Sequence, residues 1–404
     1  MTTYQDSSKI IYCKLEYGKA YGGVWDGDGG AIFCAYSKLI VKHCLLKNNS
    51  ANVEPGMGGA IYCIDCIAPS QIISNNIINN NIALVQGGGI YCEHSNPEIF
   101  NNIINNNESS VGGGICCAFY GSPTLVNNVI SNNIAYLGGG IACQVSSSPT
   151  ITNCSIVNNT VVWENGSGEG LYCYTGGTIV IKNTIFCGNS APSYGNQIYV
   201  GNIDYISITF SDIEGGFDEI YNNQYVNVYQ NNIDTDPMFV DSTNGDWLLQ
   251  SISPCIDAGD PSPQYNDPED PSNPGYAMWP AQGTIRNDMG AYGGPLAGEI
   301  VIITDIDEKQ QLVDYIQIYN FPNPFDNTTT ISFRLKEESH VKLSIYNIKG
   351  ELITTLLDEE MNVGNNYQLI WDGKSKDKEL ANGIYFYKLS TQDKTFIRKM
   401  LLLR

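Results

Sequence analysis

The stretch "NNIINNNESSVGGGICC", residues 101–117, places five asparagines within seven residues and then three consecutive glycines before an isoleucine and two cysteines. Closely similar stretches occur at residues 75–92, "NNIINNNIALVQGGGIYC", and at residues 127–143, "NNVISNNIAYLGGGIAC". Internal repetition on this scale is typical of solenoids, propellers and repeat arrays. The first question is therefore which secondary structure one repeat contains.

The position that ends each glycine-containing block gives the spacing of the repeat. This column contains Cys34, Cys63, Cys92, Cys117, Cys143, Cys173 and then Val200, with steps of 29, 29, 25, 26, 30 and 27 residues. The units are rich in Asn, Gly, Ile, Val and Tyr, which favour strands and turns over helices. The repeat therefore predicts coils of about three short strands that stack about 4.8 Å apart, which is a parallel β-helix.

In a parallel β-helix, equivalent side chains of successive coils lie above one another and form ladders. We expect such a ladder at Asn76, Asn102 and Asn128, because asparagine tolerates left-handed backbone and its amide can bond to the next amide in the column. Cys44 and Cys154 fall in the same column. The glycine blocks supply positive φ at a sharp turn. No lysine follows them and no helical pattern opens after them, so a phosphate-binding loop is not expected.

All 13 cysteines lie at or before Cys255. In-register cysteines on stacked strands are about 4.8 Å apart, which is wider than a relaxed disulfide prefers. We therefore expect the six column cysteines to be a buried stack of free thiols. Disulfides outside the column, involving Cys13, Cys44, Cys66 or Cys117, are one alternative. Zinc at the "CIDC" of residues 63–66 is another, disfavoured because there is no second CxxC and there are three histidines in all.

A column of tyrosines, Tyr62, Tyr91, Tyr172 and Tyr199, directly precedes the cysteine column. Neighbours on a strand point to opposite faces, so burial of the adjoining isoleucines and cysteines places the tyrosines outside. The pattern therefore predicts an exposed aromatic stripe suited to binding sugars.

The charge is uneven: residues 1–299 hold 8 Lys and Arg against 27 Asp and Glu, whereas residues 300–404 hold 13 against 15. An acidic surface argues against nucleic acid and anionic membranes as partners. No apolar run of about 20 residues predicts a transmembrane helix. The N-terminus lacks the pattern of a secretory signal peptide, and "SSKIIYCKLEYG" already looks like part of a coil, so we expect the true start to lie upstream.

Residues 1–235 are assigned to the solenoid and residues 236–298 to its closing segment. The stretches "DPMFVDSTNGDWLLQSISPCIDAGD" and "GTIRNDMGAYGG" resemble the end of many bacterial right-handed parallel β-helix proteins. Apolar residues here are expected to cap the last coil, namely Phe239, Trp247, Leu248, Ile256 and Tyr292. Five acidic residues crowd the same segment: Asp257, Asp260, Asp267, Glu269 and Asp270. They could form a calcium loop, but a solvated acidic loop is the simpler interpretation, and no other cofactor is expected.

A linker is expected at residues 299–317. From residue 318, the alternating runs "ISFRL", "VKLSIYN", "YQLIWDG" and "GIYFYKL" predict a small antiparallel, Ig-like β-sandwich. The predicted fold is thus all-β, a right-handed parallel β-helix followed by this sandwich.

Residues 319–404 closely resemble the type A C-terminal sorting domain of the type IX secretion system of Bacteroidota and related bacteria. The matching blocks are "NPF", "IYNIKGE", "WDG", "NGIYFY" and "RKMLLLR", with Phe321 where a tyrosine is usual. They supply Asn323, Pro324, Phe325, Gly350, Trp371, Gly373, Gly383, Tyr385 and Lys399. The resemblance implies recognition at the outer membrane, followed by release of the passenger or its attachment to surface lipopolysaccharide. A purely structural module, as in the flagellar hook-capping protein, is the alternative.

Parallel β-helices resembling this one include polysaccharide lyases, hydrolases and adhesins, so the fold does not decide the function. The solenoid before residue 236 has no arginine, which disfavours a lyase acting on uronates. A hydrolase needs clustered carboxylates. Asp26 and Asp28 in "VWDGDGG", beside Trp25, are weak catalytic candidates, because a turn explains them equally well.

The sequence therefore favours an exported, secreted or cell-surface protein that is not an enzyme and acts in glycan binding, adhesion or scaffolding. Its expected partners are the type IX secretion machinery and glycans or surface proteins. A glycoside hydrolase and a passive rigid spacer are the alternatives.

Overall fold

The computed structural model describes residues 8–21, 27–66, 71–162, 166–190, 197–297, 318–321, 325–335, 338–362, 366–375, 378–391 and 395–404. The chain divides into two units, Met1–Leu312 and Val313–Arg404. Both consist mainly of strands. The described residues contain four short 3-10 helices, η1 (Gly216–Glu219), η2 (Asn223–Tyr225), η3 (Ser242–Asn244) and η4 (Pro263–Tyr265).

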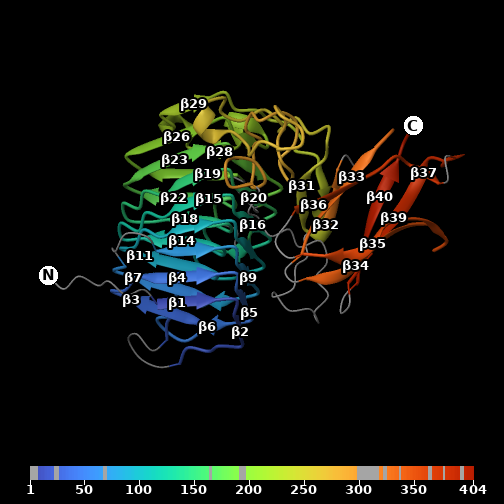
Figure 1. The fold of residues 1–404 in the computed structure, drawn as a ribbon. Helices are drawn as coiled ribbons and strands as arrows, with labels where there is room; N and C mark the ends of the chain where they lie inside the picture. Colours follow the sequence, from blue (N-terminus) through green and yellow to red (C-terminus); the bar gives the residue numbers. More distant parts are fainter. Residues whose placement is uncertain are drawn as a thin grey trace. The chain divides into compact units, whose positions relative to one another are not determined.

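The first unit is a right-handed β-solenoid of about seven turns, and each coil adds one parallel strand to each of three sheets. Figure 1 shows these coils stacked in sequence order from blue to green. The first sheet contains β1 (Ser8–Ile11), β4 (Leu39–Lys42), β8 (Ile72–Ser74), β12 (Glu98–Phe100), β15 (Thr124–Val126), β19 (Thr150–Thr152), β23 (Thr178–Lys182), β26 (Tyr205–Thr209) and β29 (Val228–Gln230).

The other two sheets follow in the same way along each coil. The second sheet contains β2 (Lys14–Glu16), β5 (Leu45–Lys47), β9 (Ile77–Asn79), β13 (Ile103–Asn105), β16 (Val129–Ser131), β20 (Ser155–Val157), β24 (Ile185–Cys187) and β27 (Asp212–Ile213). The third sheet contains β3 (Ile32–Ala35), β7 (Ile61–Ile64), β11 (Ile90–Glu93), β14 (Ile115–Ala118), β18 (Ile141–Cys143), β22 (Leu171–Thr175), β25 (Ile198–Asn202) and β28 (Ile220–Tyr221). Two short pairs, β6 (Ser50–Ala51) with β10 (Ile82–Ala83) and β17 (Ile134–Ala135) with β21 (Thr160–Val161), complete the coils.

The strand register of the third sheet matches the repeat in the sequence. Cys63 pairs with Cys34 on one side and with Cys92 on the other, and the pairing continues through Cys117, Cys143 and Cys173 to Val200. These side chains point into the solenoid, where they pack with isoleucines such as Ile61 and Ile90. No two of the 13 cysteines are bonded to each other in the structure. Burial of each isoleucine contributes roughly 2 kcal/mol to stability. The stacked apolar side chains of the interior are therefore the main stabilising feature of the solenoid.

We call the turns that join consecutive strands of a coil its corners. The two asparagines of a pair have different roles at these corners. The first asparagine of a pair, such as Asn101 (φ 55°) or Asn106 (φ 55°), adopts the left-handed conformation that turns the chain. The second points inward and joins a ladder: the Nδ2 atom of Asn76 donates to Oδ1 of Asn102 at 2.9 Å, and Asn102 donates likewise to Asn128 at 3.0 Å. The predicted ladder is therefore confirmed, and it explains why asparagines occur in pairs.

A second, longer ladder was not expected from the sequence. It runs through Asn49, Asn81, Asn107, Asn133, Asn159 and Asn189, with every Nδ2–Oδ1 distance between 2.9 and 3.0 Å. After the second asparagine corner and before the third sheet, the glycine blocks let coils approach closely. A Cβ atom on Gly88 would lie 2.4 Å from the carbonyl oxygen of Gly113 on the next coil. That contact excludes any side chain at this position without a shift of the backbone.

The closing segment covers the outer face of the second sheet, and Phe210 and Ile233 of the last coils are half-buried in the same apolar cluster. It contains the antiparallel hairpin of β30 (Phe239–Asp241) and β31 (Asp246–Leu249). Trp247, Leu248 and Tyr292 pack in one cluster with Val129, Val157 and Ile185, which point outward from the second sheet. Because these outward side chains are apolar, the closing segment shields the outer face of the second sheet from solvent. Phe239 and Ile256 are half-buried in the same cluster.

Corner asparagines attach this segment to the solenoid. The Nδ2 atom of Asn127 donates to the carbonyl oxygen of Ala291 at 2.8 Å, and that of Asn153 donates to the carbonyl oxygen of Asp288 at 2.9 Å. The turn residues of the repeat therefore also bind the segment that follows it.

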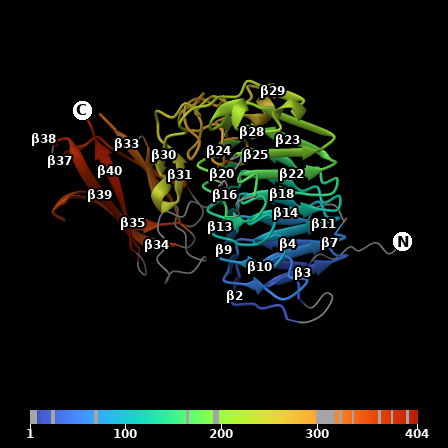
Figure 2. The ribbon, with the colours of Figure 1, turned by 180° about the vertical axis from the view of Figure 1, so that it is seen from behind.

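The second unit is a two-layer antiparallel β-sandwich (Figure 2). One sheet contains β32 (Ile318–Phe321), β33 (Thr329–Arg334) and β36 (Asn366–Trp371). The other contains β35 (Leu352–Met361), β34 (Ser339–Asn347), β39 (Gly383–Ser390) and β40 (Thr395–Leu402). The short strands β37 (Lys374–Ser375) and β38 (Lys378–Glu379) form a separate hairpin. Phe333, Leu343, Trp371 and Tyr387 lie in a single core between the two sheets.

Candidate functional site

The corner that follows the third sheet differs from the two asparagine corners. We call it the third corner; its left-handed positions are Tyr36 (φ 52°), Asp65 (φ 50°), His94 (φ 45°), Phe119 (φ 47°) and Val145 (φ 46°). A left-handed conformation costs a residue with a bulky side chain about 1–2 kcal/mol. Such strain persists where the surroundings enforce it, and it is concentrated at functional sites.

Aromatic rings are exposed along the third corner. Tyr36 is 63% exposed, Tyr120 is 62% exposed and Phe119 is 40% exposed. The His94 ring lies between coils, with its centroid 6.0 Å from that of Phe119 and 6.1 Å from that of Tyr120. Rings from three of four successive coils are thus exposed at this corner, and Asp65 occupies the same position on the coil between Tyr36 and His94.

Carboxylates lie directly beside these rings. Asp65 accepts a hydrogen bond from the Tyr36 hydroxyl, and its Oδ1 atom is 3.7 Å from Nδ1 of His94. Glu93, which precedes His94, accepts a 2.5 Å hydrogen bond from the hydroxyl of Tyr62. We call Asp28, Tyr36, Tyr62, Asp65, Glu93 and His94 the acidic–aromatic cluster.

Asp28 is the buried member of this cluster. Its Oδ1 atom accepts a 2.9 Å hydrogen bond from the backbone N–H of Met57. Burial raises the pKa of Asp28, the Met57 hydrogen bond opposes that rise, and the negative charge of Glu93 adds to it. Burial and then the hydrogen bond to Glu93 raise the pKa of Tyr62, so its hydroxyl remains a donor at neutral pH. The cluster therefore carries negative charge and offers oxygen acceptors next to exposed rings.

The predicted tyrosine stripe is not exposed, and this prediction was wrong. Tyr62 is 2% exposed, Tyr91 is 0% exposed and Tyr172 is 6% exposed, while Tyr199 is half-buried. The tyrosines do point away from the solenoid interior, as strand alternation requires. They are covered by a second layer, the turn residues Met57, Val111 and Leu137, which precede the glycine blocks and pack on the same cluster.

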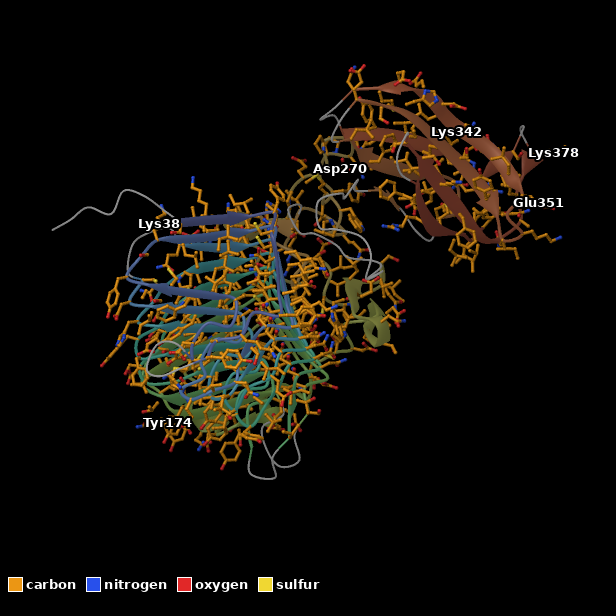
Figure 3. All side chains as sticks on the ribbon, turned by 90° about the horizontal axis from the view of Figure 1, so that it is seen from below. Lys38, Tyr174, Asp270, Lys342, Glu351 and Lys378 are labelled. Carbon is orange, nitrogen blue, oxygen red and sulfur yellow. The ribbon has the colours of Figure 1, made fainter. Side chains whose placement is uncertain are left out.

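Exposed rings on the outer side of the third sheet occur instead at its last coils. Tyr174 is 52% exposed, and Figure 3 shows it on the outside of the solenoid. Its ring stacks on that of Tyr172 with the centroids 6.1 Å apart.

Only part of the predicted Asp26 and Asp28 pair can be placed. Asp26 and Trp25 lie outside the described residues, whereas Asp28 joins the acidic–aromatic cluster. Sequence reasoning missed Asp65, Glu93 and Tyr36. The available signal was that Tyr36 and Asp65 follow the glycine blocks at the spacing of the repeat, whereas Glu93 is the last residue of β11 and directly precedes His94.

The acidic residues considered for a calcium loop are bonded to protein donors in the structure. Within the described part of the chain, no three histidine, cysteine or acidic side chains group as ligands of a metal ion. Asp260 Oδ2 is 2.6 Å from Nζ of Lys182, and Asp257 Oδ1 accepts from the Thr284 hydroxyl at 2.6 Å. The remaining carboxylates accept hydrogen bonds from backbone N–H groups: Asp267 from Asp288, Glu269 from Gly275 and Asp270 from Ser272.

In the sandwich, the sequence motifs converge near the end of the last strand. Phe325 is buried against Trp371 (ring centroids 5.6 Å apart), and Trp371 packs against Tyr385 (5.6 Å). Gly350 (φ 78°) and Gly373 (φ 65°) make left-handed turns. Gly383 begins β39 and Lys399 lies in β40. Asn323 and Pro324 lie outside the described residues.

The turns that carry these motifs bind Arg404, which sequence reasoning missed. Its Nε donates to the carbonyl oxygen of Asp326 at 3.0 Å, its Nη1 to that of Leu380 at 3.2 Å, and its Nη2 to that of Asp372 at 3.1 Å. Asn382 pairs with the Arg404 backbone through two 2.9 Å hydrogen bonds. A single guanidinium therefore holds three separate turns together.

Comparison with protein-family models agrees with both units. Residues 56–233 match the right-handed β-helix region, and residues 317–403 match the secretion system C-terminal sorting domain. A search among curated proteins found no match. Among the described residues, no helix is both long and apolar enough to cross a membrane.

Proposed function

We propose that this protein, a right-handed β-helix with a C-terminal secretion-system sorting domain, binds neutral glycans at the third corner of its solenoid. The match over residues 317–403 implies handling by the type IX secretion machinery, and it makes the chain a secreted or cell-surface β-helix protein. Binding of glycans at a surface would serve adhesion, which is the role we assign to the solenoid.

The observation that carries this proposal is the row of exposed rings beside acceptor carboxylates. Aromatic faces pack against the apolar C–H face of a sugar. The carboxylates of Asp65 and Glu93 can accept hydrogen bonds from sugar hydroxyls, and bonds to charged acceptors are the stronger ones. The negative charge of the cluster repels uronates and sulfated sugars, so it favours neutral glycans.

The second candidate function is glycoside hydrolysis, which Asp28 and Glu93 favour in one respect. Glycosidases pair a carboxyl of raised pKa, as the acid, with an ionised carboxylate. Burial and the charge of Glu93 raise the pKa of Asp28 in this sense. However, Asp28 is 6% exposed and is bonded to the Met57 backbone, while Glu93 is bonded to Tyr62. The carboxyl that would act as the acid is thus buried and bonded to the backbone, away from a sugar at the surface, so binding is the stronger proposal.

A glycan array probed with the full chain tests the proposal. Tyr36→Asn and Phe119→Asn remove two rings but supply the residue that the other corners use for the same backbone conformation. We expect selective binding to neutral glycans, lost in the double variant and kept in Tyr225→Ala, which removes an exposed tyrosine elsewhere. Binding that survives in the double variant, or that prefers anionic glycans, would contradict the proposal. Release of product, abolished by Glu93→Gln, would replace it with the hydrolase.

A further inference from the structure

We infer that Cys34 and Cys66 form a disulfide bond between adjacent coils of the exported protein. The two Sγ atoms lie 3.5 Å apart in the solenoid interior. The Cys66 thiol also lies 3.3 Å from the carbonyl oxygen of Cys34, and it contacts the Cys63 thiol of its own coil as well. Both residues are buried in the same core cluster.

The geometry of this pair differs from that of the stacked column. Cys34 faces Cys63 in register, and that pairing keeps their Cβ atoms near the interstrand spacing of about 4.8 Å. Cys66 lies beyond the end of β7 and after the left-handed turn at Asp65, so strand pairing does not fix its position. The bond requires the sulfur separation to close from 3.5 Å to about 2.05 Å.

An oxidant reaches the pair when local opening of the solenoid exposes the two sulfur atoms. Export places the chain in compartments where disulfides form and persist.

The chemistry requires one oxidant, a disulfide of a thiol oxidase or of a small thiol. The thiolate of one cysteine attacks a sulfur of that disulfide, which forms a mixed disulfide and releases one thiolate of the oxidant. The thiolate of the other cysteine then attacks the cysteine sulfur of the mixed disulfide and releases the second thiolate. Cys34 and Cys66 together lose two protons and two electrons, and the oxidant is reduced to two thiols.

Peptide mapping of the full chain, isolated after export and alkylated without reduction, is the direct test. We expect one pair of peptides joined through Cys34 and Cys66, which separates after reduction, and 11 alkylated cysteines among the total of 13. Recovery of both residues as alkylated thiols would overturn the inference. So would a link between Cys63 and Cys66, the competing CxxC pair.

Thermal unfolding with and without a reductant gives a second readout. Reduction should lower the melting temperature of the unmodified chain by several degrees, because the bond closes a loop of about 30 residues in the unfolded chain. The same treatment should not change Cys34→Ser or Cys66→Ser. Cys92→Ser, which alters the thiol column alone, should keep the response to the reductant. If the reductant does not change the melting temperature of the unmodified chain, the inference is also overturned.

Discussion

The asparagine corners and the third corner of the solenoid meet the same backbone requirement with different residues. Asn101 and Asn106 adopt a left-handed conformation with φ of 55°, and Tyr36, His94 and Phe119 adopt nearly the same conformation with φ of 45–52°. Asparagine does so at low cost, whereas a bulky side chain is strained. The difference shows that the asparagine corners let the coils stack with little backbone strain. At the third corner, strained residues lower the stability of the solenoid and present their side chains to solvent.

The largest effect should come from breaking a ladder. Asn107 accepts hydrogen bonds from the backbone and side-chain nitrogens of Asn81, and its Nδ2 donates to Ile78 and Asn133. Asn107→Leu leaves several buried polar groups without partners, each costing about 1–3 kcal/mol, so we expect a loss of roughly 4 kcal/mol. Urea denaturation measures it.

The matched control is the preceding residue, Asn106, which is exposed and left-handed. Asn106→Gly keeps that conformation accessible and removes no ladder contact, so it should cost less than about 0.5 kcal/mol. Equal losses in the two variants would show that the corner, and not the ladder, stabilises the coil.

A pH-dependent effect should come from Glu169, which interrupts the glycine column of Gly59, Gly88, Gly113 and Gly139. It is fully buried, its carboxyl accepts no hydrogen bond from any other described residue, and burial raises its pKa to about 8. The folded chain therefore keeps a proton that the unfolded chain releases above its ordinary pKa of 4.5, so stability falls as pH rises from 4.5 to 8.

Glu169→Gly restores the repeat and should flatten this dependence. We expect the variant to melt at a higher temperature than the unmodified chain at pH 8 and to gain much less at pH 4.5. Asp267, whose pKa burial raises to about 8, shifts stability in the same direction in both proteins and serves as the internal control. A gain that is the same at both pH values would refute the assignment of the charge effect to Glu169.

A smaller effect should accompany the substitutions at the third corner. Tyr36→Asn and Phe119→Asn should each stabilise the solenoid by up to about 1 kcal/mol, because they relieve the strain of a bulky left-handed residue. Denaturation of the variants used for the glycan array measures this gain. Loss of binding together with increased stability would separate a functional role of the rings from a structural one, whereas destabilisation would show that the rings hold the corner together.

The smallest effect should come from His94→Asn. His94 and Asp65 are 3.7 Å apart and both are well exposed, and an ion pair of this kind contributes about 0–1 kcal/mol. We expect stability to change by less than about 0.5 kcal/mol, by denaturation at pH 6 and pH 8. A larger loss would place His94 among the structural residues of the corner.

The periodic parts of the fold could be predicted from the sequence because one spacing determined them. The cysteine column and the ladder from Asn76 to Asn128 required only that successive repeats be aligned on their glycine blocks. The side to which Tyr62 and Tyr91 point also followed from strand alternation. Their burial did not, because Met57, Val111 and Leu137 belong to turns of variable length and share no residue type.

The acidic–aromatic cluster was not predicted for a related reason. Its corner carries Tyr36, Asp65, His94 and Phe119 in successive coils, so no single residue type marks the column. Asp28 and Glu93 are 65 positions apart (93 − 28) and interact only after two coils have closed. Resemblance to a known family identified the sorting domain and its motifs, but the three turns that bind Arg404 are neighbours only in the folded sandwich.

The ladders also make the solenoid modular in length. Between these asparagines, the side-chain amide nitrogen of one coil donates to the amide oxygen of the next. Each such coil therefore presents an acceptor to the coil before it and a donor to the coil after it. Removing residues 101–126 would join Phe100 to Asn127 and bring Asn128 to the place that Asn102 holds beneath Asn76. A gene encoding such a repeat can therefore gain or lose a whole coil in one event and still specify a folded protein, whereas an insertion of one residue within a strand would disturb the register on both sides.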